Sequence, residues 1–164
     1  MTDDIIGETL YVHFRDKDDL VRTLAEEQIG ALRARLRAAR QRVIAGAGIE
    51  AVRETFRAPL ETWIDRPSLF RLYAQEMLHP GSPLGAVARQ MRDEVRRDLV
   101  EDLARFGLPA ATAAERQRLD MIAEAMIAQT EALALAYIDG RYDDLEAVVD
   151  VLTRFAAGLL GLSG

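Results

Sequence analysis

The chain has 164 residues, a formal net charge of −6 and no cysteine. This length suits one domain with a core large enough to fold without disulfides or a structural metal. The lack of cysteine excludes disulfides, thiolate metal ligands, cysteine nucleophiles and thiol redox sensing. The first residues lack the basic and apolar segments of a signal peptide. Residues 132–138 come closest to a membrane span and are too short, so we expect a cytoplasmic protein with no membrane partner.

The charge is distributed unevenly along the chain. Residues 9–42 carry eight basic and five acidic side chains, a net charge of +3, so the rest carries −9. A protein with a net negative charge has little general affinity for nucleic acid. A basic N-terminal part nevertheless suits a chain that contacts DNA only at that end. Arg33, Arg37 and Arg40 share one helical face. A solvated arginine-rich face is the simpler alternative.

The spacing of apolar residues is helical throughout, and no stretch shows the strict alternation of a half-buried strand. These patterns predict an all-α protein. Six helices are expected, over about residues 16–46, 49–65, 66–77, 84–106, 119–138 and 143–162. Pro59 should kink or split the second helix, because proline removes a backbone hydrogen bond and clashes with the preceding turn. Asp16 is a suitable N-cap, and Gly107 and Gly140 are suitable helix ends.

The last two helices, about residues 119–138 and 143–162, are the most apolar part of the chain. In the first of them apolar residues cover nearly the whole circumference, so most of its sides must be buried. One subunit of this size does not readily cover both helices, which favours an isologous homodimer with a four-helix interface. The alternative is a central core helix within a monomer.

The single lysine of the chain, Lys17, lies in the segment Thr-Leu-Tyr-Val-His-Phe-Arg-Asp-Lys-Asp-Asp-Leu, residues 9–20. This segment resembles the end of the helix-turn-helix of TetR-family transcriptional regulators, where T-L-Y-x-H-F-x-x-K-x-x-L closes the recognition helix. The resemblance implies a TetR-like helical bundle. Residues 1–17 would be a remnant of the helix-turn-helix DNA-binding domain, and residues 18–164 would be the helical ligand-binding and dimerisation domain.

Four side chains of this segment are suited to contact operator DNA. Hydroxyl, ring N–H and ammonium groups hold phosphates and set the register of a recognition helix. By the resemblance, the DNA-binding residues are Thr9, Tyr11, His13 and Lys17. They could instead cover a helix junction or lie in solvent. Only eight residues precede Thr9, whereas the family places two supporting helices there, so we expect a longer protein or a truncated form that cannot assemble a complete DNA reader.

The family also implies an inducer pocket within the helical core. Large aromatic and methionine side chains suit a small apolar ligand, with a few polar groups to orient it. The candidate ligand-binding residues are Phe56, Trp63, Phe70, Tyr73, Met77, Met91, Met121, Met126, Gln129 and Tyr137, with Gln75, Glu124 and Thr130 as further polar groups. Ordinary core packing is the alternative for each of them.

The sequence offers no site for catalysis. The only two histidines, His13 and His79, lie in different segments and in no metal-ligand spacing. No glycine-rich phosphate loop or G-x-S-x-G motif occurs. We expect no enzyme, no metal site and no cofactor. The resemblance implies a DNA-binding transcriptional regulator, a repressor released from operator DNA by a small apolar ligand. The alternative is a truncated dimeric ligand-binding or interaction module with no DNA binding of its own.

Overall fold

The computed structural model describes residues 17–79 and 81–162. In order along the chain, the described residues form the helices α2 (Lys17–Ile44), α3 (Gly48–Ile64), α4 (Pro67–Met77), α5 (Pro83–Phe106), α6 (Ala113–Ile138) and α7 (Leu145–Leu160). No strand occurs in this part of the chain. The predicted all-α fold is therefore confirmed.

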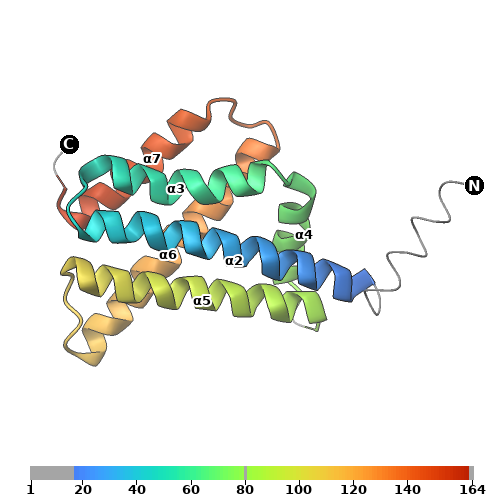
Figure 1. The fold of residues 1–164 in the computed structure, drawn as a ribbon, viewed down its shortest axis with the longest axis horizontal. Helices are drawn as coiled ribbons and strands as arrows, with labels where there is room; N and C mark the ends of the chain where they lie inside the picture. Colours follow the sequence, from blue (N-terminus) through green and yellow to red (C-terminus); the bar gives the residue numbers. More distant parts are fainter. Residues whose placement is uncertain (1–16, 80, 163–164) are drawn as a thin grey trace, which may run out of the picture.

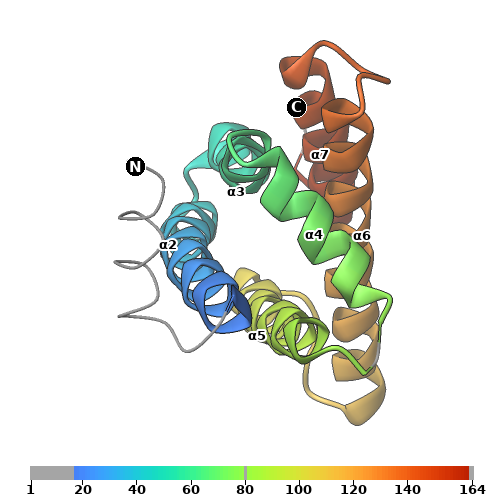
Figure 2. The same ribbon diagram turned by 90° about the vertical axis from the view of Figure 1, so that its right-hand side faces the viewer.

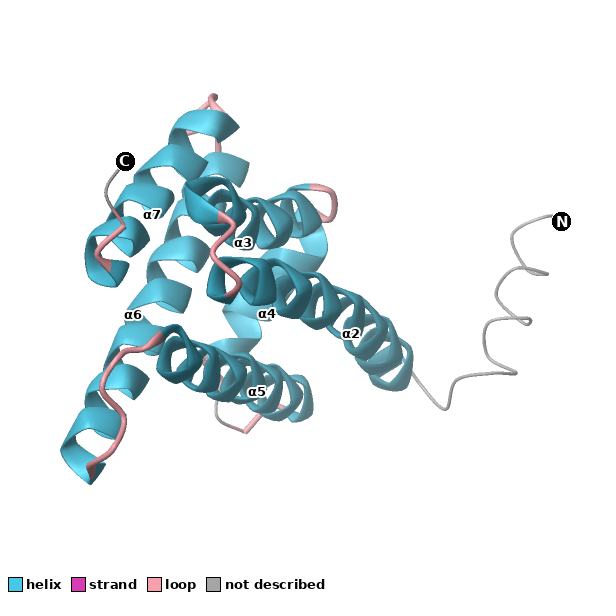
Figure 3. Ribbon diagram, turned by 60° about the vertical axis from the view of Figure 1, so that its left-hand side comes forward, coloured by secondary structure: helices cyan, strands magenta, loops and turns pink. Residues whose placement is uncertain are grey.

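The helices form two groups that cross each other. α2, α3 and α5 run side by side, and α6 and α7 cross behind them (Figures 1 and 3). α4 joins the end of α3 to the start of α5. α2 packs against α3 and α5, while α3 packs against α7 and α5 against α6. The core between the two groups is built from fully buried aliphatic side chains, the largest of which are Leu60, Leu119, Leu152, Val52 and Val149.

The turn between α4 and α5 is specified by local chemistry. Ser82 caps α5 by accepting a hydrogen bond from the backbone N–H of Gly85, and Pro83 occupies the first turn, where its missing N–H costs nothing. A Cβ atom at Gly85 would lie 2.5 Å from the carbonyl oxygen of Glu76. Glycine therefore permits the close approach of the two helices. At the other end of α5, Gly107 adopts a left-handed conformation with φ of 113° and stops the helix.

One predicted helix boundary was wrong, and one predicted helix break does not occur. α6 begins at Ala113, not near Leu119, because Thr112 and Glu115 form a capping box ahead of its apolar part. The Thr112 hydroxyl accepts from the N–H of Glu115 at 3.2 Å, and the Glu115 carboxylate accepts from the N–H of Thr112 at 2.8 Å. Pro59 does not split α3, which runs through it from Gly48 to Ile64. Pro59 is buried, so its packing helps to offset the lost hydrogen bond.

Many arginines join one helix to another. Arg33 of α2 lies 2.9 Å from a carboxylate oxygen of Asp98 of α5. Arg96 of α5 lies 2.7 Å from Asp120 of α6, and Arg71 of α4 lies 2.8 Å from Asp139, which follows α6. The arginine-rich face of α2 is therefore partly an interhelical surface, not simply a solvated or DNA-facing one. Such partly exposed pairs orient the helices more than they stabilise them.

α6 is long and apolar enough to cross a membrane by length and composition alone, with a mean hydropathy of 1.3 over an 18-residue window. This differs from the expectation that only residues 132–138 come near a membrane span. In the fold, Glu124 and Glu131 of this helix form ion pairs with Arg92 of α5. Only 22% of the window is buried. α6 thus has one side packed in the bundle and a second apolar side that stays exposed.

Candidate ligand-binding site

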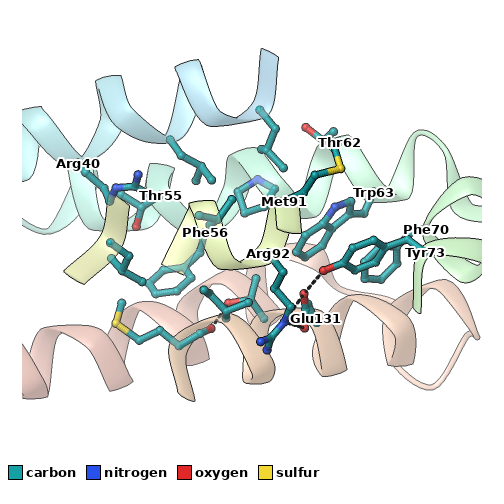
Figure 4. A pocket seen from close by; sticks show the side chains of 18 of the residues that line it. Arg40, Thr55, Phe56, Thr62, Trp63, Phe70, Tyr73, Met91, Arg92 and Glu131 are labelled. Carbon is teal, nitrogen blue, oxygen red and sulfur yellow. Dashed lines mark hydrogen bonds and ion pairs between the residues drawn. The ribbon is translucent and has the colours of Figure 1, made fainter. Parts of the chain in front are cut away.

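A cavity of about 210 Å³ lies between the helices, and all six described helices contribute to its wall. In Figure 2, α2, α3, α4 and α5 lie around the middle of the bundle, and α6 and α7 run along one side of it. Most of the wall is aliphatic or aromatic, with a small number of charged and hydroxyl groups (Figure 4). An apolar cavity with few polar groups is the usual form of a small-molecule site.

An aromatic stack forms one end of this cavity. Trp63, in the last turn of α3, stacks on Phe70 of α4 with ring centroids 4.4 Å apart and planes inclined by 13°. Phe70 in turn stacks on Tyr73 at 5.9 Å. Residues three apart lie on the same face of a helix, so α4 presents both of its rings to the cavity. The stack provides a flat apolar surface against which a ring or an alkyl chain can pack.

A hydrogen-bonded network lies beside the stack. The Tyr73 hydroxyl donates to Glu131 of α6 at 2.8 Å, and Arg92 of α5 lies 3.2 Å from Glu131 and 2.7 Å from Glu124 (Figure 4). Burial, followed by the negative charge of Glu131 and the hydrogen bond to it, raises the pKa of Tyr73 far above its ordinary value. Burial lowers the pKa of Arg92, but the two glutamates outweigh it and the net shift is upward. Tyr73 is therefore a neutral hydrogen-bond donor and Arg92 a permanent cation.

A buried ion pair forms part of the wall between α2 and α5. Arg40 Nε donates to Asp102 Oδ2 at 2.6 Å, and only 8% of the Arg40 side chain and 7% of the Asp102 side chain are exposed. The other carboxylate oxygen of Asp102 accepts from Arg105 at 3.2 Å. Figure 4 shows Arg40 at the opposite end of the cavity from Trp63 and Tyr73. The Arg40–Asp102 pair thus lies at the end of the cavity opposite the aromatic stack, whereas the Arg92–Glu131 pair lies beside the stack.

The structure brings together six of the ten predicted ligand residues. The cavity wall includes Phe56, Trp63, Phe70, Tyr73, Met91 and Met126, and also Thr130. Arg40 and Asp102 were not predicted. The available signal was the position of Arg40 between Leu36 and Val43, at helical spacing on the apolar stripe of α2.

The other four predicted residues do not line the cavity: Met77, Met121, Gln129 and Tyr137. Met121 is 59% exposed and lies on the outer side of α6, because the packed side is set by Leu119, Ala123 and Met126. Tyr137 packs against the core cluster. These four residues lie outside the cavity wall, and their binding of a ligand stays a prediction.

The predicted DNA-binding residues are not tested by the structure. Thr9, Tyr11 and His13 lie outside the described residues. Lys17 is the first residue of α2, and its side chain is not described. DNA contact by these residues stays a prediction. Within residues 17–79 and 81–162, no cluster of three or more histidine, aspartate or glutamate side chains is arranged to hold a metal ion.

Comparisons with known proteins identify the fold around this cavity. A family described as "Tetracyclin repressor-like, C-terminal domain" matches residues 65–159, which is more than half of the chain. The comparisons with curated proteins and with solved structures found no match. The matched residues include α4, α5 and α6 and nearly all of α7. The chain therefore belongs to the TetR family, and residues 65–159 form its tetracycline repressor-like C-terminal domain.

Proposed function

We propose that the protein is a cytoplasmic, DNA-binding transcriptional regulator, a repressor that leaves its operator when a small apolar ligand enters the cavity. Membership of the TetR family supports a regulatory role. Residues 1–17 would belong to the DNA-binding domain, and residues 18–164 would bind the ligand and form the dimer. Thr9, Tyr11, His13 and Lys17 would contact operator phosphates.

The cavity is the observation that carries this proposal. It lies in the middle of the bundle and has an aromatic stack at one end. Among its wall residues, Phe56, Phe70 and Met91 are buried. Filling an apolar space of this kind with an apolar ligand restores contacts that the empty wall lacks. A ligand here would touch every helix of the bundle at once.

The second subunit would cover an apolar face formed by the outer sides of α6 and α7. We define the apolar face by its exposed residues, which are Met121, Ala125, Ala128 and Ala132 of α6 with Val151, Phe155 and Leu159 of α7. α6 and α7 together form one side of the molecule (Figure 2). The alanines allow helices of two subunits to approach closely, and a self-complementary apolar patch is the usual basis of a twofold dimer.

The ligand and the dimer would communicate through helices that serve both. α6 contributes Met126 and Thr130 to the cavity wall and Met121 to the apolar face. α7 contributes Leu160 to the wall and Phe155 to the face. A ligand that favours one arrangement of these helices would increase the fraction of dimers in that arrangement. The two DNA-reading heads would then no longer match successive major grooves.

Ligand entry can be tested with a neutral apolar dye, Nile red, and a pair of matched variants on α5. Ala88 is buried in the cavity wall, whereas Ala86 is exposed on the same helix and lies outside the wall. We expect Nile red to bind the wild-type protein and the Ala86→Phe variant. The Ala88→Phe variant should lose most of the dye, because its ring occupies the cavity. Equal binding by all three proteins would contradict the cavity as the site.

DNA binding can be tested with the natively expressed protein. Its intact mass, compared with the 18.3 kDa of this sequence, shows whether further residues precede Met1 in the cell. The same preparation is then used to select fragments of genomic DNA. If the protein binds specific fragments and a cavity ligand releases them, the proposed repressor function is supported. Retention of none would favour a dimeric ligand-binding or interaction module.

A further inference from the structure

The hydroxyl groups of the cavity wall already donate to protein oxygens. The hydroxyls of Thr55, Thr62 and Thr130 donate to backbone carbonyls of their own helices at 2.6–2.8 Å. The Tyr73 hydroxyl donates to Glu131. Buried hydroxyl donors normally have an acceptor of this kind, so none of these four groups needs a ligand as its acceptor.

Two carboxylates of the wall, Asp102 and Glu131, also have hydrogen-bond donors. Asp102 accepts from Arg40 through one oxygen and from Arg105 through the other. Glu131 accepts from Tyr73 and from Arg92. A cationic ligand would have to compete with these guanidinium groups for the same oxygens. These two carboxylates therefore do not favour a cation.

Arg40 differs from all of these groups. A guanidinium carries five N–H donors, and Arg40 uses only its Nε, which donates to Asp102. For its Nη1 and Nη2 the structure gives no hydrogen-bond partner within residues 17–79 and 81–162. Yet the side chain is only 8% exposed and lines the cavity. These Nη groups are not sealed off from solvent, so an acceptor that enters the cavity can reach them.

We propose that the cavity binds an amphipathic carboxylic acid, whose carboxylate is held by the free Nη groups of Arg40 and whose apolar body lies toward Trp63 and Phe70. A planar carboxylate matches the forked donors of a guanidinium. The Arg40–Asp102 pair fixes the orientation of the guanidinium before the ligand arrives. A ligand with a single negative charge suits the Arg40 end of the cavity, because Asp102 would repel a dianion, such as a phosphate monoester, more strongly.

This inference rests on the proposed function only in requiring that the cavity takes a ligand. The chain contains one tryptophan, Trp63, which lines the cavity, so its fluorescence reports on occupancy. The full chain would be titrated with decanoate, methyl decanoate and decylammonium, each below its micelle concentration, with calorimetry as a second readout. We expect decanoate to bind at least about tenfold more tightly than methyl decanoate, as a charge-assisted hydrogen bond allows.

The relative affinities of the three ligands decide between the possible outcomes. Methyl decanoate is more apolar than decanoate, so apolar burial alone predicts that the ester binds more tightly. An ester that binds as well as decanoate, or a tighter decylammonium, would overturn the inference. A protein that binds Nile red without preferring decanoate would overturn the inference and leave the proposed function in place. A protein that binds neither Nile red nor decanoate would overturn both.

A pair of variants on α2 tests the role of Arg40. Arg40→Gln should abolish the preference for decanoate, whereas Arg33→Gln should retain it. Arg33 is matched to Arg40 because it also pairs with a carboxylate of α5 but does not line the cavity. Removing one partner of a buried ion pair can unfold a protein, so the double variant Arg40→Met with Asp102→Leu replaces the pair by apolar groups. A tenfold preference that survives in a folded Arg40 variant would overturn the proposal.

Discussion

Tyr73 of α4 and Glu131 of α6 share a 2.8 Å hydrogen bond at the wall of the cavity. The contact joins the helix that carries the aromatic stack to the helix that carries part of the apolar face. Because Glu131 also lies 3.2 Å from Arg92 of α5, three helices meet at one carboxylate. A ligand that moves α4 would therefore pull on α6 through this network, which gives the proposed coupling a physical path.

Tyr73 should remain protonated in the folded protein at alkaline pH. Burial, the charge of Glu131 and the hydrogen bond raise its pKa well above the ordinary value of 10.0. A tyrosine with a raised pKa contributes stability that is present below the unfolded pKa and is lost as the pH rises above it. In a spectrophotometric titration to about pH 11, the folded wild type and Tyr73→Phe should therefore show the same number of ionised tyrosines. In denaturant, the wild type should show one more.

A smaller absorbance change of the folded protein in Tyr73→Phe than in the wild type would contradict this prediction. It would mean that the Tyr73 hydroxyl is not protected by burial and by its hydrogen bond to Glu131.

Glu146 of α7 should make the attachment of α7 to α3 sensitive to acid. Hydrogen bonds from Arg57 and then Arg53 lower its pKa from the ordinary 4.5. A carboxylate with a lowered pKa contributes stability that is present above the unfolded pKa and is lost as the pH falls through the folded pKa. The free energy of unfolding of the wild type should exceed that of Glu146→Gln at pH 7. The difference should shrink as the pH falls below 4.5.

Urea unfolding of both proteins at a series of pH values measures this difference. Asp143→Asn is a suitable control, because Asp143 is exposed and the described residues give it no ion pair. If the difference in free energy of unfolding between wild type and Glu146→Gln does not change with pH, the arginines do not stabilise the charged form of Glu146.

The positions of the helices could largely be predicted from the sequence, because most of them have a core-facing apolar stripe. Leu32, Leu36 and Val43 recur at helical spacing in the first long helix, and all three are buried. The start of α6 was missed because its first turn is polar, although Thr112 and Glu115 have the spacing of a capping box. Apolar periodicity reports the buried part of a helix and not its capped end.

The cavity could be predicted only in part, for two physical reasons. α6 is apolar on nearly every side, so periodicity could not separate the packed Met126 from the exposed Met121. Arg40 was missed because a buried charge is explained only by its partner, and Asp102 lies 62 residues away in the sequence. Pairings of this kind depend on the tertiary fold.

Thr112→Ala should destabilise the protein by about 1 kcal/mol, because it removes the hydroxyl that accepts the N–H of Glu115 and disrupts the capping box. Thr112→Ser keeps a hydroxyl and should retain most of the stability. The measurement is the free energy of unfolding in urea, at one protein concentration so that any dimer contributes equally. Equal stability of the alanine and serine variants would show that the cap contributes nothing to the fold.

Phe155→Glu should convert a dimer of this protein into monomers. Phe155 is 62% exposed near the middle of the exposed side of α7, and a carboxylate there would be buried without a partner in the proposed interface. We expect the dissociation constant from sedimentation equilibrium to rise by about tenfold or more, as for loss of a central aromatic contact. Leu78→Glu is the matched control, since Leu78 is 80% exposed and lies outside the apolar face. If Phe155→Glu leaves the dimer intact, α7 is not the interface and the path from cavity to DNA must run elsewhere. If Leu78→Glu dissociates the dimer equally, the effect of Phe155→Glu is not specific to the apolar face and does not support it as the interface.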